Sequence, residues 1–339
     1  MTHLVTEVDV PTGMLDPLRT LPGVRVTTLE PIPLLGKPRE WPLDRLGDAE
    51  ILVCTLPPTN QQALDRLRFV QLTSVGYAQL YGLDFVRRGV RAANARGVYD
   101  TAIAEWNLAM MINLARDLRT MIRNQECGRW EVVDRFACEI RGAVAGLWGY
   151  GGIGRETARL AKALGMRVHV MTRHGVGRRA GCYVVPGTGD PDGSLPDRTF
   201  GPGDEQEFLA GLDFLILAMP LTPASTGLIG ERELRALRPT AFLLNPARGP
   251  LVQEAALLRA LDERWIAGAA LDTHFQYPLP PEHPLWRMPR VILTPHISGS
   301  DRGPHYAARF REIVTRNVQA FLSGTPLWNE LTPDELDGK

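Results

Sequence analysis

The sequence predicts an α/β protein with two open, parallel-sheet domains, and three observations support this prediction. Short apolar runs alternate with stretches of helical period, which is typical of βαβ units and of a parallel sheet. A glycine-rich turn, GYGGIG, follows one of these runs and precedes a predicted helix. The length of 339 residues corresponds to about two domains at the usual ~150 residues per domain.

Charge and composition exclude several classes of protein. Lys and Arg together number 38, as do Asp and Glu, so no net charge favours a nucleic acid. Apolar residues make up 44% and charged residues 22%, and no apolar stretch reaches the ~18 residues that span a bilayer. The first residues lack the basic and apolar regions of a signal peptide. We therefore expect a soluble, cytoplasmic protein.

The cysteines and histidines show no metal-binding pattern. No CxxC pair and no HExxH spacing occurs. We therefore expect no metal ion and no redox pair among the four cysteines, which are Cys54, Cys127, Cys138 and Cys182.

The first hundred residues are predicted to form one α/β unit. Apolar runs at 24–29, 51–56 and 68–75 predict its strands. A helix is predicted to begin at Asp100, because a carboxylate suits a helix N-terminus. We expect one long helix that continues to Met121 and is buried between two bodies. Two apolar faces support this, Ile103, Trp106, Met110, Leu114, Leu118 and Met121 on one and Ala104, Leu108, Met111 and Ala115 on the other.

Residues 143–171 predict a mononucleotide-binding βαβ unit. A strand over 143–147 leads into the glycine-rich turn, and a helix ending at Gly165 leads into a strand that ends near Met171. The first glycine of GxGxxG permits the tight turn, the second lets a pyrophosphate approach, and the third lets helix and strand pack. These glycines are Gly149, Gly151 and Gly154.

The end of the second strand indicates which dinucleotide the turn would bind. An NAD-binding strand normally ends in an acid that binds the ribose, but Thr172 stands there. Arg173 follows at once, and Arg178 and Arg179 lie further along the loop. Positive charge without a carboxylate suits a 2′-phosphate. We therefore expect NADP to be preferred over NAD.

The rest of the chain continues the same pattern. Residues 175–203 are rich in Gly, Pro, Asp and Arg and predict a long loop, either a disordered insertion or a functional flap. Four apolar runs at 212–220, 240–247, 266–272 and 291–296 predict further strands of the same sheet. A final helix is predicted to begin at Pro304.

The order of the motifs resembles that of the D-isomer-specific 2-hydroxyacid dehydrogenases. GYGGIG is followed by AMPLTPAS, LLNPARGPLVQEAALLRAL, AGAALD, PLPPEHPLW and VILTPHISGS. The resemblance implies a Rossmann NAD(P)-binding domain, residues 100–301, inserted into a flavodoxin-like substrate domain, residues 1–99 plus 302–339. It also implies catalysis in the cleft and a homodimer formed through the nucleotide domain.

The resemblance assigns roles to individual residues. It implies that Arg248, in NPARG, binds the substrate carboxylate and that His296, in TPH, exchanges the proton of the hydroxyl group. It implies carboxylate binding through backbone N–H groups of the loop Ser74, Val75, Gly76 and Tyr77. It places Asp272 near the nicotinamide carboxamide and Thr101 on the cofactor side. The remaining implied cofactor contacts are Tyr150, Gly152, Ile153, His174, Met219, Pro220, Asn245 and Ala247.

One position departs from the family pattern. Relatives carry a glutamate five residues after the aspartate, where it binds the catalytic histidine, and Tyr277 stands there instead. A neutral phenol supplies no negative charge, so we expect His296 to stay nearer the ordinary imidazole pKa of about 6.5. The expected enzyme therefore works best at neutral or slightly acidic pH. Other groups that would replace the missing acid are Glu282, His274 and Asp301.

The leading hypothesis is an NADP-preferring reductase of a small 2-oxo acid. Relatives that oxidise formate carry an amide where Tyr277 stands, so formate-like oxidation without proton transfer is one alternative. A non-catalytic NAD(P)-binding sensor or corepressor-like protein is another. Retention of both Arg248 and His296 favours the enzyme.

Overall fold

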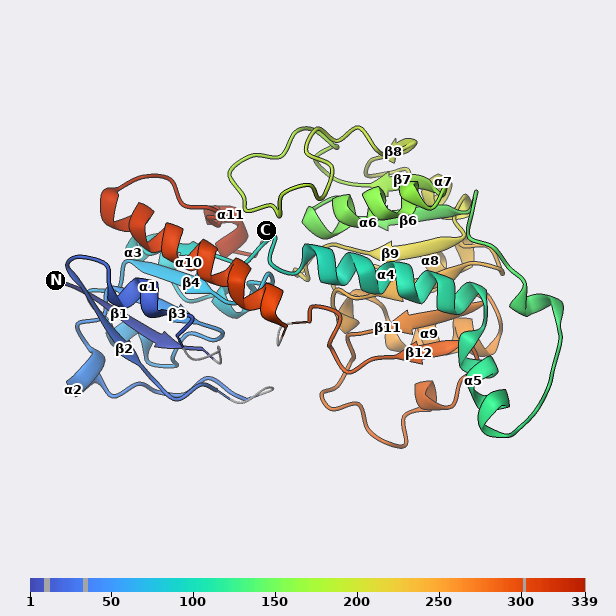
Figure 1. Ribbon diagram of the computed structural model, residues 1–339, viewed down its shortest axis with the longest axis horizontal. Coiled ribbons are helices and arrows are strands. Elements are labelled where there is room, and N and C mark those ends of the chain that lie inside the picture. The colour runs from blue at the N-terminus through green and yellow to red at the C-terminus, as the bar shows by residue number, and fades with distance from the viewer. Residues whose placement is uncertain (9–12, 33–35, 301–302, 339) are drawn as a thin grey trace. The chain divides into compact units, whose positions relative to one another are not determined.

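The chain folds into two compact units in a computed structural model that describes residues 1–8, 13–32, 36–300 and 303–338 (Figure 1). Unit 1 comprises Met1–Tyr99, Ala180–Val185 and Asp301–Lys339, and unit 2 comprises Asp100–Arg179 and Pro186–Ser300. The sequence placed 180–185 within the inserted domain, whereas these residues pack with unit 1. The predicted boundary between residues 301 and 302 lies outside the described residues.

Unit 1 is built on a five-stranded, wholly parallel sheet in the order β2-β1-β3-β4-β5. This is the flavodoxin-like strand order, as expected. Every residue of β3 and β4 is buried, which explains why these strands appear in the sequence as continuous apolar runs. The strands are β1 (Thr2–Glu7), β2 (Val24–Thr28), β3 (Ile51–Cys54), β4 (Phe69–Leu72) and β5 (Arg91–Ala93).

Helices cover both faces of the unit 1 sheet. Phe310 of α10 packs with Leu4 and Phe69 on one face, and Phe85 of α3 packs with Val5 and Val70 on the other. The predicted helix that begins at Pro304 is confirmed as α10. The helices are α1 (Asp16–Arg19), α2 (Leu43–Leu46), α3 (Phe85–Arg88), α10 (Pro304–Ser323) and α11 (Pro333–Leu336), with single 3₁₀ turns at η1 (Gln61–Ala63) and η2 (Ala78–Leu80).

Unit 2 is built on a seven-stranded parallel sheet in the order β12-β11-β10-β9-β6-β7-β8. The order reverses between β6 and β9, as in a Rossmann fold, and ligands bind at the carboxyl ends of the strands beside such a reversal. All four strands predicted after residue 210 are confirmed as β9 to β12. The strands are β6 (Val144–Trp148), β7 (Arg167–Met171), β8 (Arg198–Phe200), β9 (Phe214–Leu217), β10 (Phe242–Asn245), β11 (Gly268–Leu271) and β12 (Val291–Leu293).

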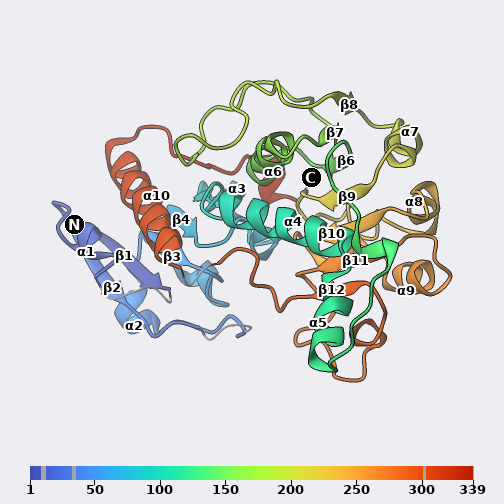
Figure 2. The same ribbon diagram turned by 45° about the vertical axis from the view of Figure 1, so that its right-hand side comes forward.

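Helices also cover both faces of the unit 2 sheet. α4 and α6 lie side by side on one face, as Figures 1 and 2 show, and α8 and α9 are neighbours on the other. The helices are α4 (Asp100–Ala115), α5 (Leu118–Glu126), α6 (Gly152–Ala163), α7 (Glu205–Ala210), α8 (Glu231–Ala236) and α9 (Glu254–Asp262), with 3₁₀ turns η3 (Asp134–Phe136), η4 (Gly249–Leu251) and η5 (Pro284–Trp286).

The single long helix predicted from Asp100 to Met121 is wrong. α4 ends at Ala115, and Asp117 takes a left-handed backbone with φ of 48° before α5 begins at Leu118. Left-handed backbone interrupts a right-handed helix, although Asp tolerates it better than most residues. The buried face of α4 is the second predicted face, with Ala104, Leu108 and Met111 inside.

The segment between Met171 and Arg198 contains no helix or strand but is ordered by its own hydrogen bonds. The Asp190 carboxylate accepts the backbone N–H groups of Gly193, Ser194 and Leu195 at 3.0 to 3.1 Å. The predicted long loop is therefore ordered, and the alternative prediction that it is a disordered insertion is wrong. No helix among the described residues is long and apolar enough to cross a membrane.

Candidate active site

The glycine-rich turn of unit 2 is shaped as a pyrophosphate cradle. Gly149 has a φ of 108°, and a Cβ there would lie 2.5 Å from the carbonyl oxygen of Ala218. A Cβ on Gly154 would lie 2.5 Å from the carbonyl oxygen of Gly149, so helix and strand pack too closely for a side chain. A Cβ on Gly151 meets no atom within 4 Å, so the backbone is open there. This geometry fits a dinucleotide bound at the first N–H groups of α6.

A tight turn follows β7, where the sequence predicts the adenosine end of the cofactor. The Thr172 hydroxyl accepts the backbone N–H of His174 at 3.4 Å, and the side chains of Arg173 and His174 are exposed. Within the described chain Arg173 makes no ion pair, and Arg178 lies 3.9 Å from Asp192. The charge of Arg173 is therefore available to a ligand beside this turn.

The third arginine of this loop lies elsewhere. Arg179 lies 3.7 Å from the Asp100 carboxylate, and both groups occupy the space where a side chain at Gly152 would be. The sequence grouped Arg179 with Arg173 and Arg178 as charge for a 2′-phosphate. The fold instead brings Arg179 to the glycine-rich turn.

Arg248 is positioned by the turn that follows β10. Asn245 is buried, and its amide donates to the carbonyl oxygen of Arg248 at 2.8 Å while accepting the N–H groups of Ala247 and Arg248. The asparagine of NPARG therefore holds the backbone of this turn in place. Gly249 completes it, because a Cβ there would collide with the carbonyl oxygen of His274. The predicted cofactor contacts of Asn245 and Ala247 stay predictions.

His296 is held by a buried aspartate. The Asp272 side chain accepts hydrogen bonds from the hydroxyls of Thr294 and Ser298 at 2.5 Å and from the N–H groups of Ile297 and Ser298. His296 has a left-handed backbone, with φ of 57°, and an exposed side chain. Such strain in a non-glycine residue persists only where neighbours fix it. Asp272 is 0% exposed and therefore serves this turn, whereas its predicted contact with nicotinamide stays a prediction.

Tyr277 lies beside the ring of His296. The two ring centroids are 5.6 Å apart, and the Tyr277 hydroxyl accepts the backbone N–H of His274 at 3.2 Å. Burial raises the pKa of the Tyr277 phenol, which the His274 N–H and the positive charge of Arg248 partly oppose. Tyr277 is therefore neutral at physiological pH. Arg248, Tyr277 and His296 thus meet at the carboxyl ends of adjacent strands β10, β11 and β12.

The other groups considered as replacements for the missing acid occupy different positions. The Nε2 atom of buried His274 lies 2.8 Å from the carbonyl oxygen of Thr294, so its ring is committed to the backbone. Glu282 is exposed and makes no ion pair within the described residues. Asp301 lies outside the described residues.

The predicted substrate loop lies in unit 1 and directs its carbonyl groups inward. The carbonyl oxygens of Ser74, Val75 and Gly76 accept hydrogen bonds from Ala95 N–H, the Asn94 amide and the Ser74 hydroxyl, respectively. Within the described chain, the N–H groups of these three residues have no protein acceptor. Unpaired N–H groups of this kind suit an anion. Tyr77 is buried, with Arg96 stacked over its ring.

The remaining predicted cofactor contacts lie in unit 2. Thr101 is in the first turn of α4, Ile153 is in the first turn of α6, and Tyr150 is the buried residue within the glycine-rich turn. Met219 and Pro220 follow β9 and are at least partly accessible. No cluster of three or more His, Cys, Asp or Glu residues suited to a metal occurs in the described ranges.

The sequence alone missed the residues that hold the site in place. Thr294 and Ser298, which bind Asp272, and Asp190, which orders the loop after β7, carry no recognisable spacing signal. Thr294 and Ser298 do lie within the motif that contains His296. That proximity was the available signal for them.

Comparison with known proteins gives several matches. Residues 108–298 match the family described as D-isomer specific 2-hydroxyacid dehydrogenase, NAD binding domain. A glyoxylate reductase from Thermococcus gammatolerans is 34% identical over 299 residues, covering 85% of this chain and 84% of that protein. A glyoxylate reductase from Korarchaeum cryptofilum is 31% identical over 293 residues, covering 83% and 82%.

A solved structure shares the fold. The NADPH-dependent glyoxylate/hydroxypyruvate reductase from Sinorhizobium meliloti, in complex with NADP and sulfate, has a TM-score of 0.77 at 22% identity and covers 100% of both chains. The two-unit α/β architecture is therefore common to both proteins.

Proposed function

The chain belongs to the D-isomer specific 2-hydroxyacid dehydrogenase family, and from this premise we propose that it reduces a small 2-oxo acid to the D-2-hydroxy acid with NADPH. As a family member it is an NAD(P)-dependent oxidoreductase that acts on CH–OH donors. The names of its relatives favour glyoxylate or hydroxypyruvate as the substrate. The gathering of Arg248, Tyr277 and His296 at three adjacent strand ends carries the proposal.

Arg248 binds the substrate carboxylate and polarises the keto oxygen in this proposal. A guanidinium presents a planar pair of N–H donors that matches the two oxygens of a carboxylate. The hydrogen bonds of Asn245 fix the backbone from which this side chain extends. Within unit 1, the N–H groups of Ser74, Val75 and Gly76 have no acceptor among the described residues and suit a carboxylate, as the sequence predicts.

His296 exchanges the proton. The bound nicotinamide supplies the hydride that reduces the keto carbon. As negative charge develops on the keto oxygen, the protonated imidazole of His296 donates a proton to it, and in the reverse direction the neutral imidazole removes that proton. Asp272 fixes the turn that presents the imidazole, and Tyr277 packs beside its ring.

We propose that NADPH is preferred over NADH. Arg173 follows β7 directly, is exposed and has no ion-pair partner among the described residues. Thr172 carries no charge that would repel a 2′-phosphate. These two features support the preference, whereas Arg179 contributes to a different part of the site.

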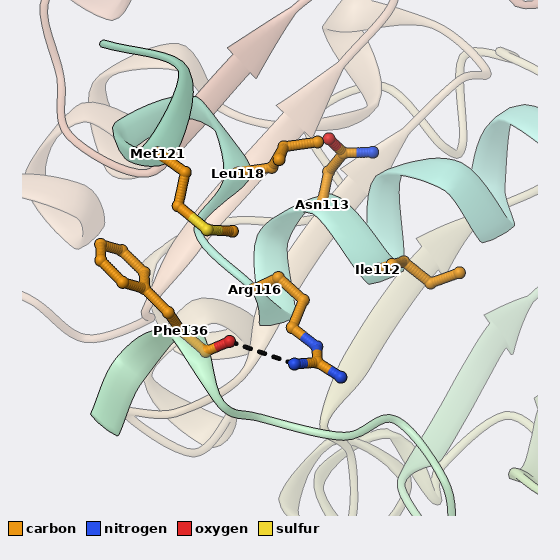
Figure 3. Close-up of a pocket in the computed structure, with 6 residues that line it drawn as sticks. All are labelled: Ile112, Asn113, Arg116, Leu118, Met121 and Phe136. Carbon is orange, nitrogen blue, oxygen red and sulfur yellow. Dashed lines mark hydrogen bonds between the residues drawn. The ribbon is translucent and has the colours of Figure 1, made fainter. Parts of the chain in front are cut away.

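We also propose that two copies associate through α4, α5 and the segment after α5. α5 has no buried residue, although Leu118 and Ile122 on it are apolar and exposed. Trp130 is 95% and Val132 83% exposed. A shallow groove opens at the start of α5, and Figure 3 shows that Leu118 and Phe136 line it. A large exposed apolar face favours an interface, and a symmetric dimer covers it with the same face of a second copy.

The test follows NADPH and NADH oxidation with glyoxylate, hydroxypyruvate, pyruvate and phenylpyruvate. The wild-type chain is expected to turn over with NADPH and one of the smaller oxo acids. His296→Ala and Arg248→Ala are expected to lower kcat/KM by at least about a hundredfold while leaving the Kd for NADPH unchanged. Binding without reduction of any oxo acid would contradict the proposal. Formate oxidation that survives His296→Ala would instead favour oxidation without proton transfer.

A further inference from the structure

We infer that Arg179 binds the pyrophosphate of the cofactor, from a loop that no sequence motif connects with that role. The inference rests on the proposed use of a dinucleotide. The loop between β7 and β8 carries the guanidinium to the first turn of α6, where the backbone of GYGGIG is open to a ligand. It assigns a phosphate contact that is common to NAD and NADP.

The position of the guanidinium is fixed by its neighbours. A Cβ on Gly152, the first residue of α6, would collide with the Asp100 carboxylate and with Nη1 of Arg179. Only a glycine at this position leaves room for both groups. Arg179 therefore lies directly against the turn, beside the N–H groups that a helix N-terminus offers to an anion.

The donors of Arg179 are still available. Its side chain is only 17% exposed, yet its guanidinium donates no hydrogen bond to any described residue. The Asp100 oxygen lies 3.7 Å away, which is too far for a hydrogen bond. A largely buried guanidinium whose N–H groups bond to no described residue is available to an anion. Two phosphate oxygens of a pyrophosphate would accept these N–H groups.

The charge of Asp100 explains why an arginine is needed here. Its carboxylate lies at the same turn and would repel a pyrophosphate, which is negatively charged. Arg179 offsets this charge. The attraction to Asp100 keeps Arg179 at the turn, so that little conformational entropy is lost when the phosphates bind.

The loop that carries Arg179 is anchored to the glycine-rich turn itself. The Tyr150 hydroxyl donates to Asp190 at 2.6 Å, and buried Arg155 donates to the carbonyl oxygens of Gly177 and Asp190. The N–H of Arg179 bonds to the carbonyl oxygen of Pro191 at 3.1 Å. The segment that appeared in the sequence as a flap is therefore a fixed support for one binding residue.

The experiment measures the Kd for NADP and for NAD by isothermal titration calorimetry with the whole chain. Arg179→Gln is expected to weaken both by about tenfold or more, and by the same factor, because both ligands contain the pyrophosphate. Arg173→Gln is expected to weaken NADP alone. Arg178→Gln is the matched control for NAD, which has no 2′-phosphate, because Arg178 is the adjacent residue and is 84% exposed, and it should change the Kd for NAD by no more than about twofold.

Each other outcome overturns the inference. Unchanged affinity of Arg179→Gln for both ligands removes Arg179 from the site. Weakened NADP binding alone would assign Arg179 to the 2′-phosphate. Thermal denaturation of the free variants checks that they fold, and Arg179→Lys, which keeps the charge, should lie between wild type and Arg179→Gln. If the wild-type chain binds neither ligand, the proposed function fails as well.

Discussion

The phenol of Tyr277 changes what His296 can do, because it stands where the family pattern has a carboxylate. Its pKa is raised by burial, so it stays neutral where a glutamate would be ionised. The ring centroids of Tyr277 and His296 are 5.6 Å apart, so the phenol contacts the imidazole by packing. A carboxylate beside an imidazole favours the protonated form, whereas a phenol does not. Tyr277 itself therefore supplies no negative charge to His296.

Tyr277→Glu should move the pH profile of reduction. His296 must carry a proton to donate it, so the rate falls as the pH rises through the titration of the imidazole. A carboxylate at 277 keeps the imidazole protonated to higher pH, and this descending limb should move upward by about one pH unit. The measurement is kcat/KM for the preferred oxo acid as a function of pH. Tyr277→Phe keeps the ring and should leave the limb in place. A limb that stays unchanged in Tyr277→Glu would contradict this account of the pair.

The residues that the sequence predicted well are those whose role depends on the local backbone. Gly149 and Gly154 are required by a turn and by a close approach within one βαβ unit, so their spacing carried the information. Arg179 was assigned to a phosphate from charge alone, and its location depends on the fold of a loop held by Asp190. Long-range placement of this kind has no local signal.

At the scale of elements, strands that are continuous apolar runs were predictable, and strands without such a run were not. β9 and β10 are entirely buried apolar runs with short connections. β8 is an edge strand of three residues with two of them exposed, so it has no apolar run. β1 is buried but includes the polar residues His3, Thr6 and Glu7, so it does not appear in the sequence as an apolar run. Whether such segments form strands depends on tertiary contacts, which leave no local pattern in the sequence.

The break between α4 and α5 gives α5 a role that one continuous helix would not have. After the left-handed Asp117, Arg119 donates to the carbonyl oxygens of Trp286, Met288 and Val291. α5 is thereby attached by its first turn, while its apolar residues remain outside. Helical periodicity continues through the break, which is why the sequence predicts one helix.

Ile122→Glu should convert the proposed dimer into a monomer. Ile122 lies on α5 with 48% of its surface exposed, so the substitution leaves the core of unit 2 intact. A charge buried at the centre of an apolar interface without a partner costs several kcal/mol, which is enough to separate a dimer at micromolar concentration. Light scattering coupled to size-exclusion chromatography measures the mass. Val86→Glu, at a similarly exposed apolar residue of α3 in unit 1, is the control for added negative charge. A wild-type chain that is already monomeric would contradict the proposed association.

At the scale of the whole molecule, the chain passes between the two units more often than the family pattern implies. Beyond the crossings near residues 100 and 300, residues 180–185 leave unit 2 and return to it. Within unit 1 this segment is firmly held. The N–H of Tyr183 donates to the Asn329 side chain at 3.1 Å, and Asn329 N–H donates to Gly181 at 3.0 Å. An insertion rich in glycine and proline thus contributes to the core of the other unit.

Tyr183→Ala should therefore destabilise unit 1 selectively. The Tyr183 ring is buried in the cluster that contains Phe310, and its hydroxyl donates to Glu312 at 3.1 Å. Burial and that carboxylate raise the pKa of Tyr183 to about 12, so the hydroxyl remains a donor. Removing a buried aromatic side chain costs about 3 kcal/mol, or roughly a hundredfold in the unfolding equilibrium.

Native-state hydrogen exchange separates the two units. Amides of β1 and β4 report on unit 1, and amides of β9 and β10 report on unit 2. In Tyr183→Ala, exchange through unfolding should accelerate by about a hundredfold in β1 and β4 and remain unchanged in β9 and β10. Val184→Ala is the control, because Val184 is 41% exposed and its loss should cost no more than about 0.5 kcal/mol. Equal acceleration in both units would contradict a selective effect on unit 1.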